Sequence, residues 1–83
     1  MQMRVTISFY SYLKEFTGCA QVTETLPEGS TIDQLFKRMA DRFPNLREMQ
    51  RSILIAVGVD YLDRDFVLKE GDAVSLFPPV QGG

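Results

Sequence analysis

Residues 31–43 read TIDQLFKRMADRF and hold the longest helical pattern of the chain. Thr31 and Gln34 are spaced as in a capping box, where each side chain accepts a hydrogen bond from the other residue's backbone N–H. Apolar residues then recur every three or four positions, and Pro44 ends the pattern. We expect an amphipathic helix whose apolar face comprises Ile32, Leu35, Phe36, Met39, Ala40 and Phe43, opposite to Lys37, Arg38, Asp41 and Arg42.

Two strands are expected before this helix. Val5, Ile7 and Phe9 alternate with polar residues, which is the period of a strand with one buried face. Gly18 follows a short helical segment and suits the left-handed conformation that ends many helices. In chain order, the predicted elements are a strand at residues 4–9, a helix at 11–16, a strand at 20–26 and a turn at 27–29.

Three further strands are expected after the helix. Residues 53–59 form a continuous apolar run with β-branched side chains, which predicts a central strand buried on both faces. Residues 66–68 predict a short edge strand, and a tight turn follows them. Residues 73–77 predict the last strand, in which Val74 and Leu76 share one face.

The order strand, strand, helix, strand, short strand, strand predicts an α+β fold. One mixed sheet of four to five strands would bury a single face against the main helix. The β-grasp is the simplest arrangement of this kind: a first hairpin crosses through the helix to a central strand, and the last strand returns beside the first. We expect this domain to span residues 1–77 and an extended tail to span residues 78–83.

Composition excludes several kinds of chemistry. The chain of 83 residues has no His and a single Cys, so it lacks zinc sites of the Cys/His type and Ser-His or Cys-His nucleophilic pairs. With 9 basic and 11 acidic residues, it lacks the basic footprint of a nucleic-acid-binding protein. No apolar run has the length of a membrane span, and the first residues do not resemble a signal peptide. We expect a cytoplasmic domain without metal, nucleic acid or membrane contacts, in which Cys19 is a structural thiol.

The tail PPVQGG, at residues 78–83, is where we expect the chemistry. Its two prolines lack backbone donors and fix φ, so the sheet cannot continue and the chain leaves it in an extended form. Gly82 and Gly83 have no Cβ and fit a channel too narrow for other residues. A stiff spacer before a slender carboxyl end is typical of a segment that enters another protein's active site.

The segment FPPVQGG, at residues 77–83, resembles the C-terminus of the small subunits of molybdopterin synthase, a MoaD-like family of ubiquitin-like sulfur carriers. The resemblance extends over nearly the whole chain, through residues 71–72, 55–57 and 13–18. Members of this family often have Asn after the central Ala-Val, where this chain has Gly58. The resemblance implies a ubiquitin-like β-grasp, in agreement with the order of the predicted elements.

The resemblance also implies that Gly83 carries sulfur. An adenylating (activating) enzyme uses ATP to activate the Gly83 carboxylate, sulfur from a donor protein then replaces AMP, and the resulting thiocarboxylate donates its sulfur to a pterin precursor. The chain has no Gly-x-x-x-x-Gly-Lys-Ser/Thr loop for ATP, so it is expected to bind no cofactor and to have no self-contained active site. It would act as the sulfur-donating subunit of a sulfurtransferase, with a large catalytic subunit, the activating enzyme and, indirectly, the sulfur donor as partners.

Aromatic residues on the sheet face away from the helix are candidates for contact with these partners. By strand parity, Tyr10 and Phe77 point away from the core, and they meet if the first and last strands are neighbours, with Tyr61 beside them. The predicted partner-binding residues are Tyr10, Tyr61, Phe77, Pro78, Pro79, Val80 and Gln81, and Gly82 and Gly83 form the reacting end.

Other functions stay open at this point. A thiamine-pathway sulfur carrier has the same fold and a Gly-Gly end but usually lacks the Pro-Pro-Val spacer, and a ubiquitin-like modifier would form isopeptide bonds through Gly83. A plain binding domain would use neither reaction. Residues 60–72 carry five acidic and two basic residues, which favours either solubility or attraction to basic partners.

Overall fold

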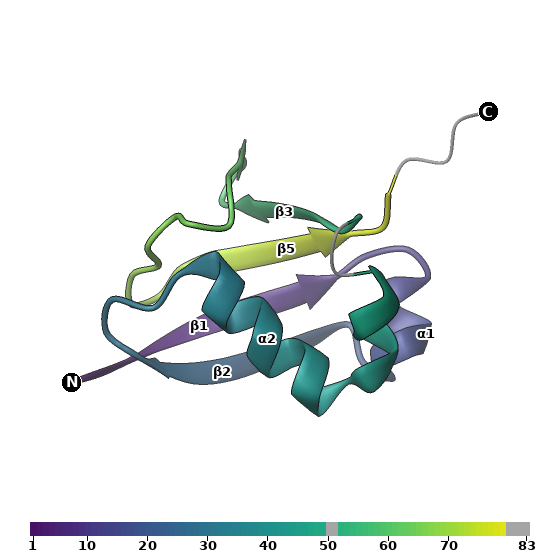
Figure 1. The fold of residues 1–83 in the computed structure, drawn as a ribbon, viewed down its shortest axis with the longest axis horizontal. Coiled ribbons are helices and arrows are strands. Elements are labelled where there is room, and N and C mark those ends of the chain that lie inside the picture. The colour runs from purple at the N-terminus through teal and green to yellow at the C-terminus, as the bar shows by residue number, and fades with distance from the viewer. Residues whose placement is uncertain (50–51, 80–83) are drawn as a thin grey trace.

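The computed structural model describes residues 1–49 and 52–79, which form a five-stranded sheet with helices packed against it. Figure 1 shows α2, the longest helix, lying across one face of this sheet. In chain order the elements are β1 (Gln2–Phe9), α1 (Leu13–Thr17), β2 (Gln21–Pro27), α2 (Ile32–Arg42), the 3-10 helix η1 (Pro44–Met49), β3 (Leu54–Val57), β4 (Asp60–Tyr61) and β5 (Ala73–Phe77).

The sheet has the strand order β2-β1-β5-β3-β4. β1 pairs antiparallel with β2 and parallel with β5, so the last strand returns beside the first, as predicted. On its other side, β5 pairs antiparallel with β3. A mixed sheet with one main helix on a single face confirms the predicted α+β, β-grasp fold.

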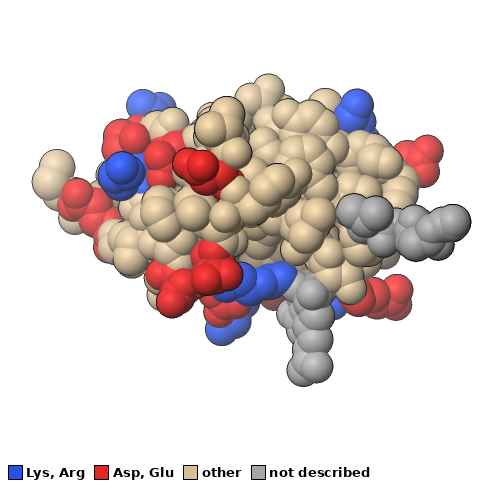
Figure 2. All heavy atoms as spheres, turned by 90° about the horizontal axis from the view of Figure 1, so that it is seen from above, with Lys and Arg blue, Asp and Glu red and all other residues tan. Residues whose placement is uncertain are grey.

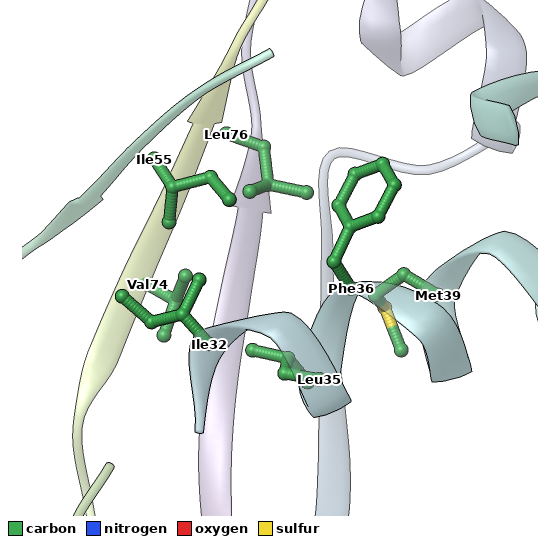
Figure 3. A pocket seen from close by; sticks show the side chains of 7 residues that line it. All are labelled: Ile32, Leu35, Phe36, Met39, Ile55, Val74 and Leu76. Carbon is green, nitrogen blue, oxygen red and sulfur yellow. The ribbon is translucent and has the colours of Figure 1, made fainter. Parts of the chain in front are cut away.

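The main helix forms as its sequence predicts. The Thr31 hydroxyl accepts a hydrogen bond from the Gln34 backbone N–H at 3.3 Å, and the Gln34 side chain accepts one from the Thr31 backbone N–H at 2.8 Å. The apolar side chains of α2 point toward those of β3 and β5 (Figure 3) and leave no room for a water molecule between the layers. The side chains that meet there are Ile32, Leu35, Phe36, Met39, Ile55, Val74 and Leu76.

The charged face of α2 lies next to the edge strand β2. Glu24 of β2 pairs with Arg42 at 3.2 Å and with Arg38 at 3.8 Å. Arg38 also donates a hydrogen bond to the Thr25 backbone carbonyl at 3.2 Å. The predicted solvent face of the helix is therefore exposed, but its arginines are tied to the neighbouring strand.

The strand predicted at residues 53–59 is shorter than expected and lies elsewhere in the sheet. β3 covers four residues next to the edge, and the central strand is β5. The prediction of burial on both faces is wrong, because Leu54 is 39% exposed and Val59 is 93% exposed. The strand ends early because Gly58, with φ of +64°, turns the chain toward β4.

The edge strand predicted at residues 66–68 is also wrong. The edge is β4, and Val67 makes only an isolated bridge outside the named strands. The backbone carbonyls of Phe66 and Arg64 instead accept hydrogen bonds from the first two N–H groups of α2, at 3.0 and 2.9 Å. These helix donors have no partner inside the helix, so the loop is held there rather than paired along the sheet.

The first helix, α1, is short and ends as predicted. Gly18 has φ of +76°, and its N–H donates a hydrogen bond to the Lys14 carbonyl at 2.8 Å. Cys19 follows as a free, half-buried thiol that packs against the core. Within residues 1–49 and 52–79, no helix has the length and apolar character that crossing a membrane requires.

Candidate partner-binding surface

Strand register brings three apolar side chains together on the open face, which we define as the sheet face opposite to α2. Leu76 of β5 is buried toward α2, so its neighbour Phe77 points to the open face. Phe77 lies directly opposite Leu54 of β3. On the other side, the Tyr10 N–H donates a hydrogen bond to the Leu76 carbonyl at 3.2 Å, which extends the β1–β5 pairing by one residue. Tyr10, Phe77 and Leu54 therefore form a row across three adjacent strands.

Phe77 lies between two tyrosine rings. The Tyr10 and Phe77 rings are stacked, with centroids 4.7 Å apart and planes inclined by 13°. Tyr61, from β4, lies with its ring centroid 6.0 Å from that of Phe77, at an inclination of 52°. Such aromatic pairs are stabilised by the geometry of their π-systems as well as by burial. The predicted meeting of Tyr10 with Phe77 is confirmed, and Tyr61 joins this pair through Phe77.

We call Tyr10, Leu54, Tyr61 and Phe77 the aromatic surface. Tyr10 is 42% exposed and Tyr61 is 66% exposed, while Phe77 is half-buried between them. Leu54 is the member that sequence reasoning missed, because the continuous apolar run around it predicted burial. The register opposite Phe77 places it on the open face, and that register depends on pairing between distant segments.

Ser11 is a special backbone position directly after the aromatic surface. Its φ of +56° is unusual for a residue other than glycine. The chain turns there, and the carbonyls of Tyr10 and Ser11 accept hydrogen bonds from the Leu13 and Lys14 N–H groups, both at 3.2 Å. Tyr10 is thus the last residue of this segment to lie along the sheet.

The tail begins beside this surface. Pro78 and Pro79 follow β5 as half-buried residues outside the sheet pairing. The other predicted site residues, Val80, Gln81, Gly82 and Gly83, lie outside the described residues. The partner-binding role of the whole set stays a prediction, although its aromatic members form one surface.

The exposed aromatic side chains suit docking of a partner protein. Among residues 1–49 and 52–79, no group of three or more metal-ligating side chains comes together. Over that same part of the chain, no buried side-chain polar atom lacks a hydrogen-bond partner. Exposed aromatic side chains on a rigid sheet are typical anchors of protein–protein interfaces. The geometry therefore offers an apolar platform at the point where the tail leaves the sheet.

Comparison with known proteins gives matches over the full domain. A family model described as the ThiS family matches residues 7–83. The molybdopterin synthase sulfur carrier subunit of Escherichia coli is 32% identical over 82 residues, covering 95% of this chain and 99% of that protein. The human molybdopterin synthase sulfur carrier subunit is 30% identical over 83 residues, covering 96% and 94%.

Solved structures with the same fold agree with these relatives. A candidate molybdopterin converting factor subunit 1 from Pyrococcus furiosus matches with a TM-score of 0.87 at 27% identity, covering 94% of this chain and 99% of that one. A chain from the complex of subunits 1 and 2 of the Helicobacter pylori molybdopterin-converting factor matches with a TM-score of 0.69 at 27% identity, covering 98% and 100%.

Proposed function

Because the chain belongs to the ThiS family, we propose that it is a sulfur carrier that serves molybdenum cofactor biosynthesis as the small subunit of a molybdopterin synthase. The observation that carries this proposal is the end-to-end similarity to the sulfur carrier subunit of Escherichia coli, at 32% identity. The β-grasp fold and the Gly-Gly sequence at residues 82–83 support it.

The cycle begins with activation of the Gly83 carboxylate. A carboxylate is a poor acyl donor, because attack on it would have to expel oxide. One Gly83 oxygen attacks the α-phosphorus of ATP in the activating enzyme, pyrophosphate leaves, and an acyl adenylate results. This chain has no nucleotide-binding loop of its own in its sequence, so ATP belongs to the enzyme.

Sulfur transfer then proceeds in two displacements. A persulfide of the donor protein attacks the Gly83 carbonyl carbon, AMP leaves, and an acyl disulfide forms. A second thiol cleaves its sulfur–sulfur bond, which yields the Gly83 thiocarboxylate and a disulfide on the donor side. In the synthase, the thiocarboxylate sulfur displaces an oxygen substituent from a carbon of the pterin precursor. Water then cleaves the acyl–sulfur bond, which regenerates the carboxylate and leaves the sulfur on the pterin as a thiol. Two such deliveries build one dithiolene, so the carrier has to dissociate and return.

The domain contributes binding and presentation in this scheme. The aromatic surface gives the large subunit and the activating enzyme an apolar platform beside Pro78, where the tail leaves β5. The Helicobacter pylori relative forms a complex with a second subunit, which supports a large-subunit partner for this chain. Use of one platform by both partners would make their binding mutually exclusive and would suit a carrier that cycles.

Intact-mass measurement tests the proposal. The full chain is incubated with a molybdopterin-pathway activating enzyme, ATP and a persulfide donor, and parallel samples omit ATP or use a Gly83-deleted chain. We expect a mass gain equal to replacement of one oxygen by sulfur, in the complete sample only. Addition of the large subunit and pterin precursor should then return the carrier to its original mass. If no sulfur-dependent mass change occurred, the chain would have no carrier role. If Gly83 instead formed adducts on other proteins, the chain would be a protein modifier. Either result would overturn the proposal.

A further inference from the structure

A hollow of about 380 Å³ lies at the end of the sheet opposite to the aromatic surface. It opens between the turn that joins β3 to β4 and the turn that precedes β5. Ala73, the first residue of β5, lines it, whereas Phe77 is at the other end of that strand, roughly 13 Å away at the usual rise per residue. The hollow is therefore separate from the surface assigned to the tail-using partners.

Its floor is apolar. Val57, Leu62 and Phe66 line it and pack against the core while staying partly accessible. Two of the walls are the backbone of Gly58 and Gly71, and a Cβ added at either position would meet no atom within 4 Å. The absence of side chains there leaves the floor open to solvent. Next to it, at the tip of the hairpin, Val59 is almost fully exposed.

Its rim is acidic. Asp60 and Asp72 line the hollow, and within the described part of the chain neither carboxylate makes an ion pair. Asp72 accepts a hydrogen bond from the Lys69 backbone N–H at 2.8 Å through one oxygen. Lys69 is the only cationic residue among those that line the hollow, and its ammonium group makes no ion pair with a described residue. Figure 2 shows most carboxylates toward the left end of the molecule, with some Lys and Arg side chains among them, and the connection between β4 and β5 lies at that end in Figure 1.

An apolar floor with a carboxylate rim has a specific chemical complement. Arginine and lysine side chains lay their methylene stems on apolar surface and keep the charged head in water. The Phe66 ring adds an aromatic surface, which favours a guanidinium. A bare metal ion would gain nothing from the floor, and no metal-ligating group of three or more side chains forms within residues 1–49 and 52–79.

We propose that this hollow binds an arginine side chain from a basic segment of a partner protein. The stem lies on Leu62 and Phe66, and the guanidinium meets Asp60 and the free oxygen of Asp72. Because the hollow is at the far end of β5 from Phe77, this contact is compatible with a second protein on the aromatic surface. The inference concerns an interaction beyond the sulfur-carrier role and does not depend on it.

The probe for the test is the peptide acetyl-Gly-Arg-Gly-amide, titrated into the full isotopically labelled chain and followed through backbone amide resonances. The matched probe contains citrulline, which keeps the shape of arginine but not its charge. We expect saturable shifts at Gly58, Leu62 and Gly71 with the arginine peptide and none with the citrulline peptide. Shifts that do not saturate, or that spread equally over all acidic segments, would overturn the proposal.

Three variants sharpen the result. Asp60→Asn should weaken the apparent affinity about two- to fivefold, which is the range for one exposed charge pair. Glu48→Gln makes the same charge change at an exposed position of η1 and should leave the affinity unchanged. Lys69→Gln removes the competing cation and should tighten binding. Equal weakening by Asp60→Asn and Glu48→Gln would show attraction to net charge alone and would reject the hollow as a site.

Discussion

Gly83 is the residue on which the proposed chemistry depends, both for its carboxylate and for its missing Cβ. We propose that the tail enters a partner channel that admits only backbone, so a side chain at this position should not fit there. We expect deletion of Gly83, or Gly83→Val, to abolish sulfur transfer to the pterin precursor while the free energy of unfolding stays unchanged. Intact mass and urea unfolding measure the two effects. Undiminished pterin sulfuration by the Gly83-deleted chain would contradict the carrier mechanism.

Tyr10 and Phe77 test whether the aromatic surface binds the large subunit. Truncation of an interface anchor typically costs at least ~1 kcal/mol of binding free energy. We expect Tyr10→Ala and Phe77→Ala each to show that loss in titration calorimetry, whereas Tyr10→Phe keeps the ring stacked on Phe77 and should bind nearly as well as the natural chain. Thr23→Ala, at an exposed position of the edge strand β2, is the control for a change elsewhere. Unaltered affinity in both alanine variants would remove the aromatic surface from the interface.

Gly58 stands at a position where members of the family that this sequence resembles often have Asn. Its φ of +64° lies in the left-handed region, which Asn enters more readily than other residues with a Cβ. We expect Gly58→Asn to lower the free energy of unfolding by less than the roughly 1–2 kcal/mol that most residues with a Cβ cost in this region. Gly58→Val should cost about 1–2 kcal/mol or more, because a β-branched residue is strained there. Equal effects of the two variants in chemical denaturation would show that the turn does not require this conformation.

At the scale of elements, α2 carries its own start signal. The Thr31–Gln34 capping box satisfies backbone donors at the first turn of the helix. We expect Thr31→Ala to lower the free energy of unfolding by about 1 kcal/mol, the usual cost of losing such a cap. Thr31→Ser keeps the hydroxyl and should stay close to the natural stability. If urea unfolding gave the same midpoint for both variants, the carbonyls of Arg64 and Phe66 would suffice as caps.

The elements differ in how far the sequence alone predicts them. α2, β1 and β5 are defined by local periodicity, and each lies where its pattern places it. β3 and β4 depend on pairing between distant segments and on the left-handed turn at Gly58, which periodicity does not report. The run at residues 53–59 is apolar for two different reasons: Ile55 faces the core, and Leu54 is part of the aromatic surface on the open face.

The candidate site was also predictable only where local strand alternation decides the position of a residue. Strand parity places Tyr10 and Phe77 on the open face, and the parallel pairing of β1 with β5 then brings their rings into contact. Tyr61 joins them only because the Gly58 turn folds β4 back beside β3, so that Tyr61 pairs with Ala56. Leu54 can be placed on this surface only from the register between β3 and β5, which local periodicity does not predict. Strand parity thus predicts which face of the sheet a residue lies on, and the order and register of the strands decide which residues of that face are in contact.

At the scale of the whole molecule, the core lies on one face of the sheet, and the two proposed binding regions lie apart from each other at opposite ends of β5. The face toward α2 holds the core, and the open face bears the aromatic surface at the end of β5 that leads into the tail. The acidic hollow lies at the other end of the same strand. A domain this small has one core to support both regions, so any loss of core packing affects both together.

Neighbouring residues of β1 test this separation. Ile7 is fully buried, and Ile7→Ala should cost about 2–5 kcal/mol. That is a large part of the roughly 4–12 kcal/mol expected for a domain of this length, so both large-subunit binding and arginine-peptide binding should weaken through partial unfolding. Thr6→Ala, one residue away on the open face, should leave the free energy of unfolding within about 0.5 kcal/mol of that of the natural chain and both binding reactions intact.

Urea unfolding followed by circular dichroism measures the stability of each variant. A Thr6→Ala chain as unstable as Ile7→Ala would mean that the open face contributes to the core, and the separation of the two faces would not hold.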